Sequence, residues 1–309
     1  PGSAGAAQPP AQPGETAPPA EEEATEFIYT VELGDTLSSI AAEAYGDPGL
    51  WRLIARANQL VNPRALKPGQ VLETNSVVLG KLVEQSGGIY ERHRAVMDDL
   101  AEIQAAVQAA VAGDYQMVLT IGGSSAGSED YAKPVVSALG EVLVHGVTIM
   151  PGKPVLVGKV AEKPVFGMPG YPVSTIIAFE QFVQPLIYQM LGQEAPQRVT
   201  VPVQPTRKLA SKLGVEEFLR VKLGQVGGRI AATPLPRGAG VITSITEADG
   251  IIRIPAHVDG LKDDEPIQAE LLKPATAIRN TLVAVGSHDN TLDILADELR
   301  AKSRLSLSS

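Results

Sequence analysis

Residues 116–140 read QMVLTIGGSSAGSEDYAKPVVSALG, and this stretch decides the fold class of the chain. A short apolar run, typical of a buried strand, stops at two glycines, and a segment with helical periodicity follows the polar loop. Glycines between a strand and a helix let a ligand approach the backbone closely, and the helix start offers free N–H groups to an anion. The stretch therefore predicts a strand–loop–helix unit with a candidate ligand site at the carboxyl end of the strand.

The segments around this unit continue the alternation of helix and strand. Their apolar residues recur with a period of 3.6 in the expected helices and form short runs in the expected strands. This order predicts an α/β fold with a doubly wound, mostly parallel sheet, in which ligands bind at the carboxyl ends of the strands. The expected elements are helices at 75–88, 98–113 and 173–191, a strand at 142–150 and a hairpin at 154–170.

Shifts in composition divide the chain into five predicted parts. The first is rich in Pro, Ala and Glu and has no aromatic or large aliphatic residue, so it predicts a disordered linker. A short α+β unit, the α/β region, a β-rich stretch and a tail follow it. The predicted boundaries are 1–25 for the linker, 26–72 for the α+β unit, 73–193 for the α/β domain, 198–272 for a small β-domain and 273–309 for the tail.

Composition and charge exclude several classes of protein. The chain has 309 residues, of which 44% are hydrophobic and 20% charged, as in ordinary globular proteins. It has no cysteine, which excludes disulfides and thiolate metal sites. A net charge of −9 argues against nucleic-acid binding. The sequence shows no signal peptide as given and no apolar run near the roughly 20 residues of a membrane span.

Two loops carry the residues with the clearest chemistry. In the glycine-rich loop, Asp130 stands where its carboxylate either caps the following helix or holds a ligand amine or a metal ion. Paired Pro-Gly turns at 150–158 and 167–174 predict two stiff loops at one sheet edge. Lys153 is the one cation in these turns, and it is either a phosphate contact or a solvated side chain beside the hairpin.

Five runs of residues 73–193 resemble a known family. They are NSVVLGKLVEQSGG, MDDLAEI, GGSSAGSEDY, PGKPVLVG and GMPGYPVSTIIAFEQFVQPL, in this order. Together they look like the molybdopterin molybdotransferase family of molybdenum-cofactor biosynthesis, and the β-rich stretch after them is similar to that family's C-terminal β-domain. The resemblance implies insertion of molybdate into adenylylated molybdopterin with Mg²⁺ assisting. It also implies a homodimer with its pocket between subunits and a cytoplasmic location.

The same resemblance assigns roles to single residues. It implies catalytic roles for Asp130, Asp98 and Lys153, and metal ligation by Asp98 and Asp130, with Asp99 completing an acidic pair. It places the pterin against the glycine-rich loop, the second Pro-Gly loop and two positions of the β-domain. The implied binding residues are Gly122, Gly123, Ser124, Ser125, Gly127, Pro169, Gly170, Pro172, Ser174, Arg220 and Ser244.

The chain also departs from the family's pattern. Two lysines that the family often carries are Gly146 and Met150 here, and the loop usually written LPGNP contains Tyr171 in place of an amide. The first strand of the family's sheet and two further N-terminal domains are missing from the sequence. We therefore expect a sheet without its first strand and a weak catalyst. The segment LVAVGSHDNTLDILADELR at 282–300 resembles the opening of a periplasmic-binding-type domain, cut short.

Residues 26–72 carry a second resemblance. The runs YTVELGDTLSSIA, YGDPGLWRLIARAN and NPRALKPGQVL look like a lysin-motif domain, a module that binds N-acetylglucosamine-containing glycans between two loops. Turn, cap or core roles compete with glycan binding at several of these positions, since Asp35 or Thr36 can cap a helix. The implied glycan-binding residues are Gly34, Asp35, Thr36, Leu37, Asn62 and Pro63.

Three functions remain open from the sequence. The first is an enzyme of molybdenum-cofactor biosynthesis, which the longer resemblance favours. The second is a glycan-binding protein of the cell envelope with a vestigial enzyme fragment. The third is a molybdopterin-binding protein that inserts no molybdate.

Overall fold

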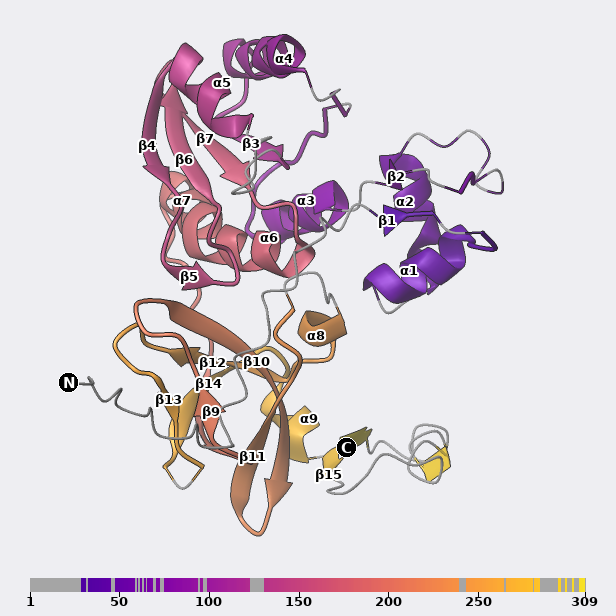
Figure 1. Cartoon of the computed structure of the whole chain (residues 1–309), viewed down its shortest axis with the longest axis vertical. Coiled ribbons are helices and arrows are strands. Elements are labelled where there is room, and N and C mark those ends of the chain that lie inside the picture. Colours follow the sequence, from indigo (N-terminus) through magenta and orange to yellow (C-terminus); the bar gives the residue numbers. More distant parts are fainter. Residues whose placement is uncertain are drawn as a thin grey trace, which may run out of the picture.

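The computed structural model arranges the chain as an N-terminal α+β unit, an α/β domain and a β-barrel, with a short tail (Figure 1). In the part of the chain that the structure describes, no helix is both long and apolar enough to cross a membrane. The described residues are 29–31, 33–45, 48–58, 60, 62, 64, 66–68, 71–72, 75–93, 95–96, 99–122, 131–238, 243–263, 265–279, 281–283, 294–295, 298, 302 and 306–308.

Two short strands and two helices build the N-terminal unit. Strand β1 (Tyr29–Thr30) pairs antiparallel with β2 (Val71–Leu72). Helix α1 (Leu37–Tyr45), a 3-10 turn η1 (Pro48–Leu50) and helix α2 (Trp51–Ala57) lie between them in the chain. The buried core of the unit consists of Val31, Leu37, Ile40, Ala41 and Ile54.

Thr36, and not Asp35, caps helix α1. The Thr36 hydroxyl accepts a hydrogen bond from the backbone N–H of Ser39 at 3.0 Å. The Ser39 hydroxyl accepts in return from the backbone N–H of Thr36 at 2.9 Å. Two N–H groups that the helix leaves without a partner are satisfied reciprocally, as in a capping box.

The α/β domain places helices on both faces of a four-stranded sheet. Val165 packs on one face with helices α4 (Leu100–Ala112) and α5 (Ala132–Leu139). Its neighbour Phe166 packs on the other face with α3 (Asn75–Gln85) and the helices that follow the sheet. Successive side chains of a strand point to opposite faces, so strand β7 contributes to both cores.

The sheet is mixed, so the expectation of a mostly parallel sheet is wrong for the described strands. The order is β3 (Val118–Ile121), β7 (Lys163–Met168), β6 (Leu156–Val160), β4 (Glu141–His145). Only β3 and β7 are parallel, and the other pairs are antiparallel. Ala161 and Glu162, both with positive φ, join β6 to β7 as a tight hairpin turn. A turn this short can connect only antiparallel strands.

The strand expected at 142–150 is two strands that belong to different sheets. Strand β4 ends at His145, and β5 (Ile149–Met150) pairs in parallel with β10 (Glu216–Val226) of the barrel. Between them Gly146 has a φ of 79°, and its N–H donates to the carbonyl of Val155 at 2.8 Å. A left-handed residue breaks the extended backbone there, and glycine adopts this conformation at little cost.

The long apolar helix expected at 173–191 forms, with one irregular turn. It consists of α6 (Pro172–Ala178), a π-helical turn η2 (Phe179–Val183) and α7 (Gln184–Met190). Pro185 lies in the first turn of α7 and has no N–H to donate to the preceding turn. A widened turn just before a proline accommodates the missing hydrogen bond.

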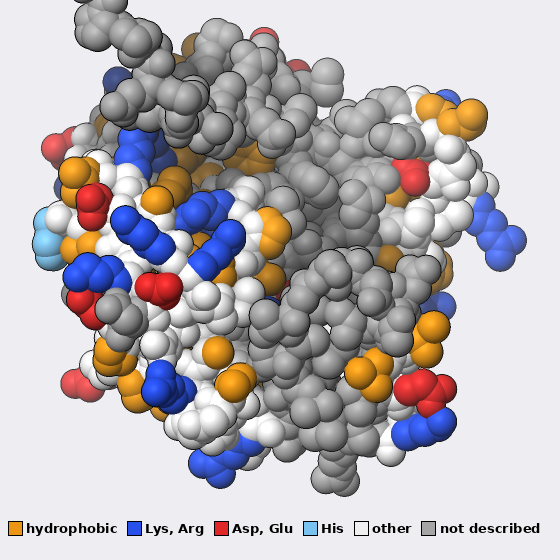
Figure 2. Space-filling model, turned by 60° about the horizontal axis from the view of Figure 1, so that its bottom comes forward, with side chains coloured by type: hydrophobic (Ala, Val, Ile, Leu, Met, Phe, Trp, Pro, Cys, Tyr) orange, Lys and Arg blue, Asp and Glu red, His pale blue; other side chains and the backbone are white. Residues whose placement is uncertain are grey.

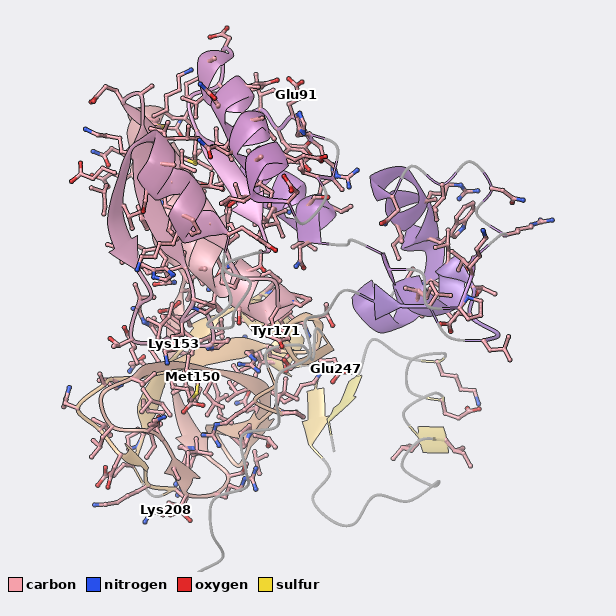
Figure 3. The ribbon with its side chains drawn as sticks, turned by 45° about the horizontal axis from the view of Figure 1, so that its top comes forward. Glu91, Met150, Lys153, Tyr171, Lys208 and Glu247 are labelled. Atoms are coloured by element: carbon pink, nitrogen blue, oxygen red, sulfur yellow. The ribbon has the colours of Figure 1, made fainter. Side chains whose placement is uncertain are left out.

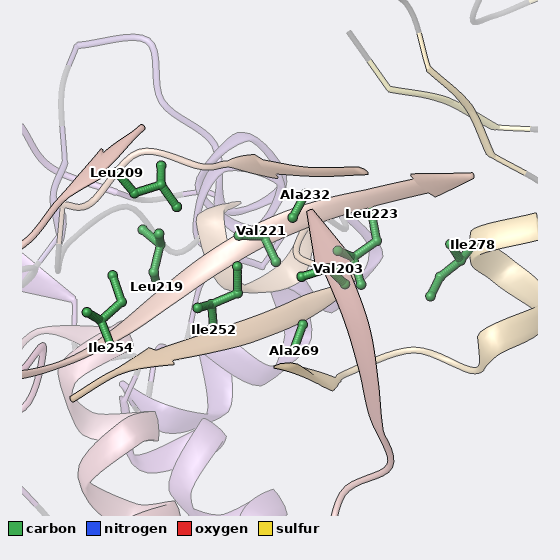
Figure 4. Close-up of a cluster of buried hydrophobic side chains, with 10 residues drawn as sticks. All are labelled: Val203, Leu209, Leu219, Val221, Leu223, Ala232, Ile252, Ile254, Ala269 and Ile278. Carbon is green, nitrogen blue, oxygen red and sulfur yellow. The ribbon is translucent and has the colours of Figure 1, made fainter. Parts of the chain in front are cut away.

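The β-rich stretch forms a closed barrel. Its strand order is β11 (Arg229–Pro234), β8 (Thr200–Pro205), β14 (Ile267–Leu271), β12 (Gly250–Ile254), β10, and β10 pairs with β11 to close the ring. Apolar side chains fill the interior, among them Leu219, Val221 and Ile252 (Figure 4). A second pair of strands, β9 (Leu209–Ala210) and β13 (Gly260–Leu261), lies beside the barrel. Lys and Arg side chains alternate with acidic ones on the face that Figure 2 turns forward.

Three short elements complete the described chain. Helix α8 (Thr243–Thr246) precedes β12, and α9 (Ala275–Arg279) follows β14. In the tail, β15 (Thr281–Val283) pairs in parallel with β16 (Ser306–Ser308).

A hydrophobic cluster joins the α/β domain to the barrel. Val173 and Ile177 of α6 pack against Phe218 of β10 and Ile251 of β12. Ile245 of α8 packs against the same cluster. The cluster brings the start of α6 next to the barrel, so residues of both domains lie around the loop before α6.

Candidate functional site

The carboxyl ends of β3 and β7 lie side by side. Ile121 and Met168 are partners in the parallel register, and the N–H of Gly122 donates to the carbonyl of Met168 at 3.3 Å. Gly122 has a φ of 82°, a conformation that favours glycine. The beginning of the glycine-rich loop and the MPGYP loop, residues 168–172, therefore start from adjacent positions at one edge of the sheet.

Two side chains outside the MPGYP loop hold its carbonyl groups. The amide of Asn75, at the start of α3, donates to the carbonyl of Gly170. The hydroxyl of Thr175 contacts the carbonyl of Pro169 and that of Tyr171, the latter at 2.8 Å. In a trans peptide the C=O and the following N–H point in opposite directions. The N–H of Gly170, which shares a peptide with the Pro169 carbonyl, therefore points away from Thr175, where it can donate to a ligand.

The MPGKP loop, residues 150–154, lies against α6, the helix that carries Thr175. Gly152 has a φ of 113°, and a Cβ on it would lie 2.9 Å from the Ile149 side chain and 3.5 Å from the carbonyl oxygen of Ser174. The Met150–Pro151 peptide bond is cis. Lys153 is exposed, and its ammonium makes no hydrogen bond or ion pair with any described residue. Its charge is thus available to a ligand at this edge.

Arg220 and Ser244, both implied pterin contacts, form a buried pair in the barrel. The Nε of Arg220 donates to the Ser244 hydroxyl at 3.2 Å, and both residues are 2% exposed. Its terminal nitrogens donate to the carbonyls of Phe218, Pro236 and Gly238 at 2.9–3.3 Å. Burial lowers the pKa of Arg220 to about 10, so the guanidinium remains charged at neutral pH. Its hydrogen bonds give Arg220 a structural role, and direct ligand contact stays a prediction.

The barrel approaches the MPGYP loop through α8 and the turn after it. Ile245, next to Ser244, packs in the cluster that contains Val173 of α6. Figure 3 shows Tyr171, Glu247, Lys153 and Met150 at the junction of the two domains. Residues from both domains thus surround the loop before α6.

Several implied site residues lie outside the described part of the chain. They are Asp98, Gly123, Ser124, Ser125, Gly127, Asp130 and Pro63. Asp99 is described, and its carboxylate caps helix α4 by accepting from the N–H of Glu102 at 3.0 Å. No group of three or more His, Asp and Glu side chains that could hold a metal ion occurs among the described residues.

The residues implied in glycan binding differ in exposure. Gly34 has a φ of 100°, and no atom lies within 4 Å of a Cβ built on it. The Asn62 side chain is exposed and accepts from the N–H of Arg64 at 3.1 Å. Leu37 is 3% exposed and belongs to the core, so its side chain faces away from any surface ligand. Leu33, which the sequence analysis does not name, is 92% exposed beside Gly34.

Asn75 and Thr175 are the two loop-holding residues that the sequence analysis misses. Both stand in the first turn of a helix, where a polar side chain is usually assigned to capping or to solvent. Both are buried, at 5% and 1% exposure. The sequence shows only that a polar residue stands near the start of each helix. It does not show which distant carbonyl that residue binds.

Two family models match the chain. The one described as "Probable molybdopterin binding domain" matches residues 44–189. The one described as "MoeA C-terminal region (domain IV)" matches residues 202–272. The first match begins inside the N-terminal unit and ends in α7, and the second covers the barrel.

Curated relatives and solved structures agree with these matches. The chain is 36% identical over 205 residues to a protein of Methanocaldococcus jannaschii named for molybdopterin biosynthesis, covering 66% of this chain and 48% of the relative. It is 30% identical over 216 residues to molybdopterin molybdenumtransferase 2 of Mycobacterium tuberculosis, covering 67% and 52%. A MoeA protein structure from Pyrococcus horikoshii has a TM-score of 0.57 at 34% identity, covering 70% of this chain and 52% of that one. The chain thus spans about half the length of these relatives.

Proposed function

We propose that this chain, which contains a MoeA-type molybdopterin-binding domain followed by a MoeA C-terminal domain and is homologous to molybdopterin molybdenumtransferases, acts in molybdenum-cofactor biosynthesis. The reaction that we infer is insertion of molybdate into adenylylated molybdopterin. The MoeA relatives support the reaction class, and the edge of the sheet supports the place where the pterin binds.

The observation that carries the proposal is the shared edge formed by the ends of β3 and β7. Gly122 begins one loop at this edge, and in the other the N–H of Gly170 points away from Thr175. Backbone N–H groups fixed in this way suit the oxygens of a phosphate or a pterin, because they need no reorganisation when the ligand arrives. Asn75 and Thr175 supply that fixation.

Charge limits the affinity of the site for molybdate. Molybdate and phosphate are anions, and Lys153 is the cation that the two Pro-Gly loops offer. Gly146 and Met150 stand where relatives of the family often carry lysines. A positioned cation contributes commonly several kcal/mol to binding or transition-state stabilisation in such sites. We infer that the chain inserts molybdate efficiently only at raised molybdate concentrations.

The roles of Asp130 and Mg²⁺ rest on the family resemblance. Asp98 and Asp130, the implied ligands, lie outside the described residues, and the described residues hold no alternative cluster for a metal. A homodimer, a cytoplasmic location and the absence of nucleic-acid partners belong to the same proposal.

Three measurements test this function. A fluorescent pterin should bind the purified chain, and Asp130→Ala should weaken binding about 10- to 100-fold, equal to roughly 1.4–3 kcal/mol. Lys153→Ala should weaken molybdate-dependent activity, whereas Lys159→Ala, which removes a half-exposed lysine paired with Glu162, is the matched control. In a strain that lacks its own molybdotransferase, the chain should restore the activity of a molybdoenzyme at a high molybdate concentration but not at an ordinary one. No pterin binding in correctly folded protein would overturn the proposal.

A second function, binding of an N-acetylglucosamine glycan by the N-terminal unit, is favoured by one specific observation. Strands β1 and β2 pair antiparallel, and helices α1 and α2 lie between them along the chain. The order strand, helix, helix, strand is the one that the lysin-motif resemblance implies. Titration of the whole chain with chitooligosaccharide should shift the NMR signals of Gly34, Asp35 and Asn62. Unchanged signals at saturating sugar would reject glycan binding and leave an envelope location without support.

A further inference from the structure

A cavity lies at the junction of the α/β domain and the barrel. Its volume is about 540 Å³, within the range typical of small-molecule sites, and it is open on one side. The walls come from the segment 147–149, the π-helical turn η2, β10 and the turn after β12. None of the residues of the MPGYP or glycine-rich loops lines it, so it is separate from the site proposed above.

Aromatic and aliphatic side chains form the apolar wall of this cavity. Phe182 comes from η2, Phe218 from β10 and Ile149 from β5. Phe218 is 2% exposed and packs in the cluster between the domains, with the Arg253 guanidinium 4.9 Å from its ring centre, so Phe182 and Ile149 offer the accessible apolar surface. Rings and branched side chains from several elements provide the surface on which a flat apolar ligand packs.

Three polar side chains of the wall can form further hydrogen bonds. Glu216 accepts from two nitrogens of Arg253 through Oε1, at 3.1 and 3.0 Å, while its Oε2 accepts from no described residue. The Gln181 amide and the Thr148 hydroxyl likewise form no side-chain hydrogen bond with the described residues. A carboxylate accepts from an amino group, and an amide or a hydroxyl can donate to a ring nitrogen.

We propose that this cavity binds a flat heteroaromatic ring that carries an amino group, such as a nucleobase. The apolar wall takes the face of the ring, Oε2 of Glu216 accepts from its amino group, and Gln181 donates to a ring nitrogen. Because the walls belong to two domains, the ligand also fastens the α/β domain to the barrel. The proposal does not depend on the proposed function of the sheet edge.

The probe for this site is 2-aminopurine, whose fluorescence falls when it stacks on an aromatic ring. Titration of the full chain should give saturable quenching and a higher melting temperature. Purine, which lacks the amino group, should bind about tenfold more weakly, as the loss of a hydrogen bond to a charged group predicts. Equal binding of the two probes would overturn the assignment of Glu216.

Substitutions locate the binding site. Gln181→Ala, Glu216→Gln and Phe182→Leu should each weaken 2-aminopurine binding, by about five- to tenfold for the hydrogen-bonding residues. The matched control is Gln189→Ala, which removes an exposed glutamine of α7 and should leave binding unchanged. Asp130→Ala should also leave it unchanged, which separates this site from the sheet edge. Absence of saturable binding, or equal binding by all three variants with native melting temperatures, would reject the proposal.

Discussion

The side-chain amide of Asn75 donates a hydrogen bond to the backbone carbonyl of Gly170, a residue 95 positions further along the chain. This bond ties the start of α3 to the loop that follows β7. Thr175 holds the carbonyls on either side of Gly170, those of Pro169 and Tyr171. The shape of the candidate pterin loop is therefore fixed by two residues that are not part of it.

Asn75→Ala should loosen this loop. The substitution leaves the half-buried Gly170 carbonyl without its partner, which costs about 1–3 kcal/mol of unfolding free energy. Pterin affinity should fall as well, because the loop backbone that Asn75 holds loses its fixed direction. Chemical denaturation and pterin fluorescence measure the two effects. Asn62→Ala, which removes an exposed asparagine, should change neither, and an unaltered pterin affinity in Asn75→Ala would show that the loop keeps its shape unaided.

Thr175→Val should have a similar effect through a different atom. Valine keeps the volume and the branching of threonine but removes the hydroxyl that bonds two loop carbonyls. We expect a loss of about 1–3 kcal/mol of stability and weaker pterin binding. Thr200→Val, at an exposed position of β8, is the control. It measures the change in stability from replacing threonine by valine at a position that holds no loop carbonyl. Equal melting temperatures for the two variants would contradict the role given to Thr175.

Arg220→Met tests whether the buried guanidinium organises the barrel. The change removes the donors to Ser244 and to the carbonyls of Phe218, Pro236 and Gly238 while it keeps most of the side-chain volume. Loss of a buried hydrogen-bond network of this kind costs about 3 kcal/mol or more. Urea denaturation should show that loss, and Arg229→Met, at an exposed position of β11, should show little. A small effect of Arg220→Met on stability combined with a large one on pterin binding would instead support direct ligand contact.

Glu180 should make the stability of the chain depend on pH. Burial raises the pKa of Glu180 above its ordinary value of 4.5, although Arg198 lowers it and Glu270 raises it further. A carboxyl whose pKa is higher in the folded state binds more protons there, so its contribution to stability decreases as pH rises above about 4.5 and through the folded pKa. Wild type should therefore lose stability relative to Glu180→Gln between acidic and neutral pH. A constant difference between the two proteins over that range would contradict the shifted pKa.

Much of the fold follows from local pattern. The apolar run before Gly122 predicts β3, and the helical periods predict α3, α4, α5 and the long helix after Pro172, all of which the structure confirms. The mixed sheet was missed because the pattern of alternating helices and strands does not fix strand direction. The hairpin at 154–170 already contained that information, since a short connection forces antiparallel pairing.

Less of the candidate site could be predicted. Glycines and prolines mark the loops because their backbone geometry is local. The residues that hold those loops act across long sequence separations, and nothing in the sequence around Asn75 points to Gly170. The buried state of Arg220 also depends on packing between strands and the loop at 236–238, which no local pattern reports. The roles given to Asp98, Asp130 and the rest of the glycine-rich loop stay predictions.

The division of residues 141–150 between two sheets has a mechanical consequence. Strand β4 belongs to the α/β sheet, and β5 is hydrogen-bonded to the barrel, with only Gly146, Val147 and Thr148 between them. A hinge between the domains would have to stretch this short tether or break the β5–β10 ladder. The two domains should therefore melt as one cooperative unit. A protease cut in the connection before β8 would leave two fragments that remain associated, because β5 of the N-terminal fragment still pairs with β10 of the barrel.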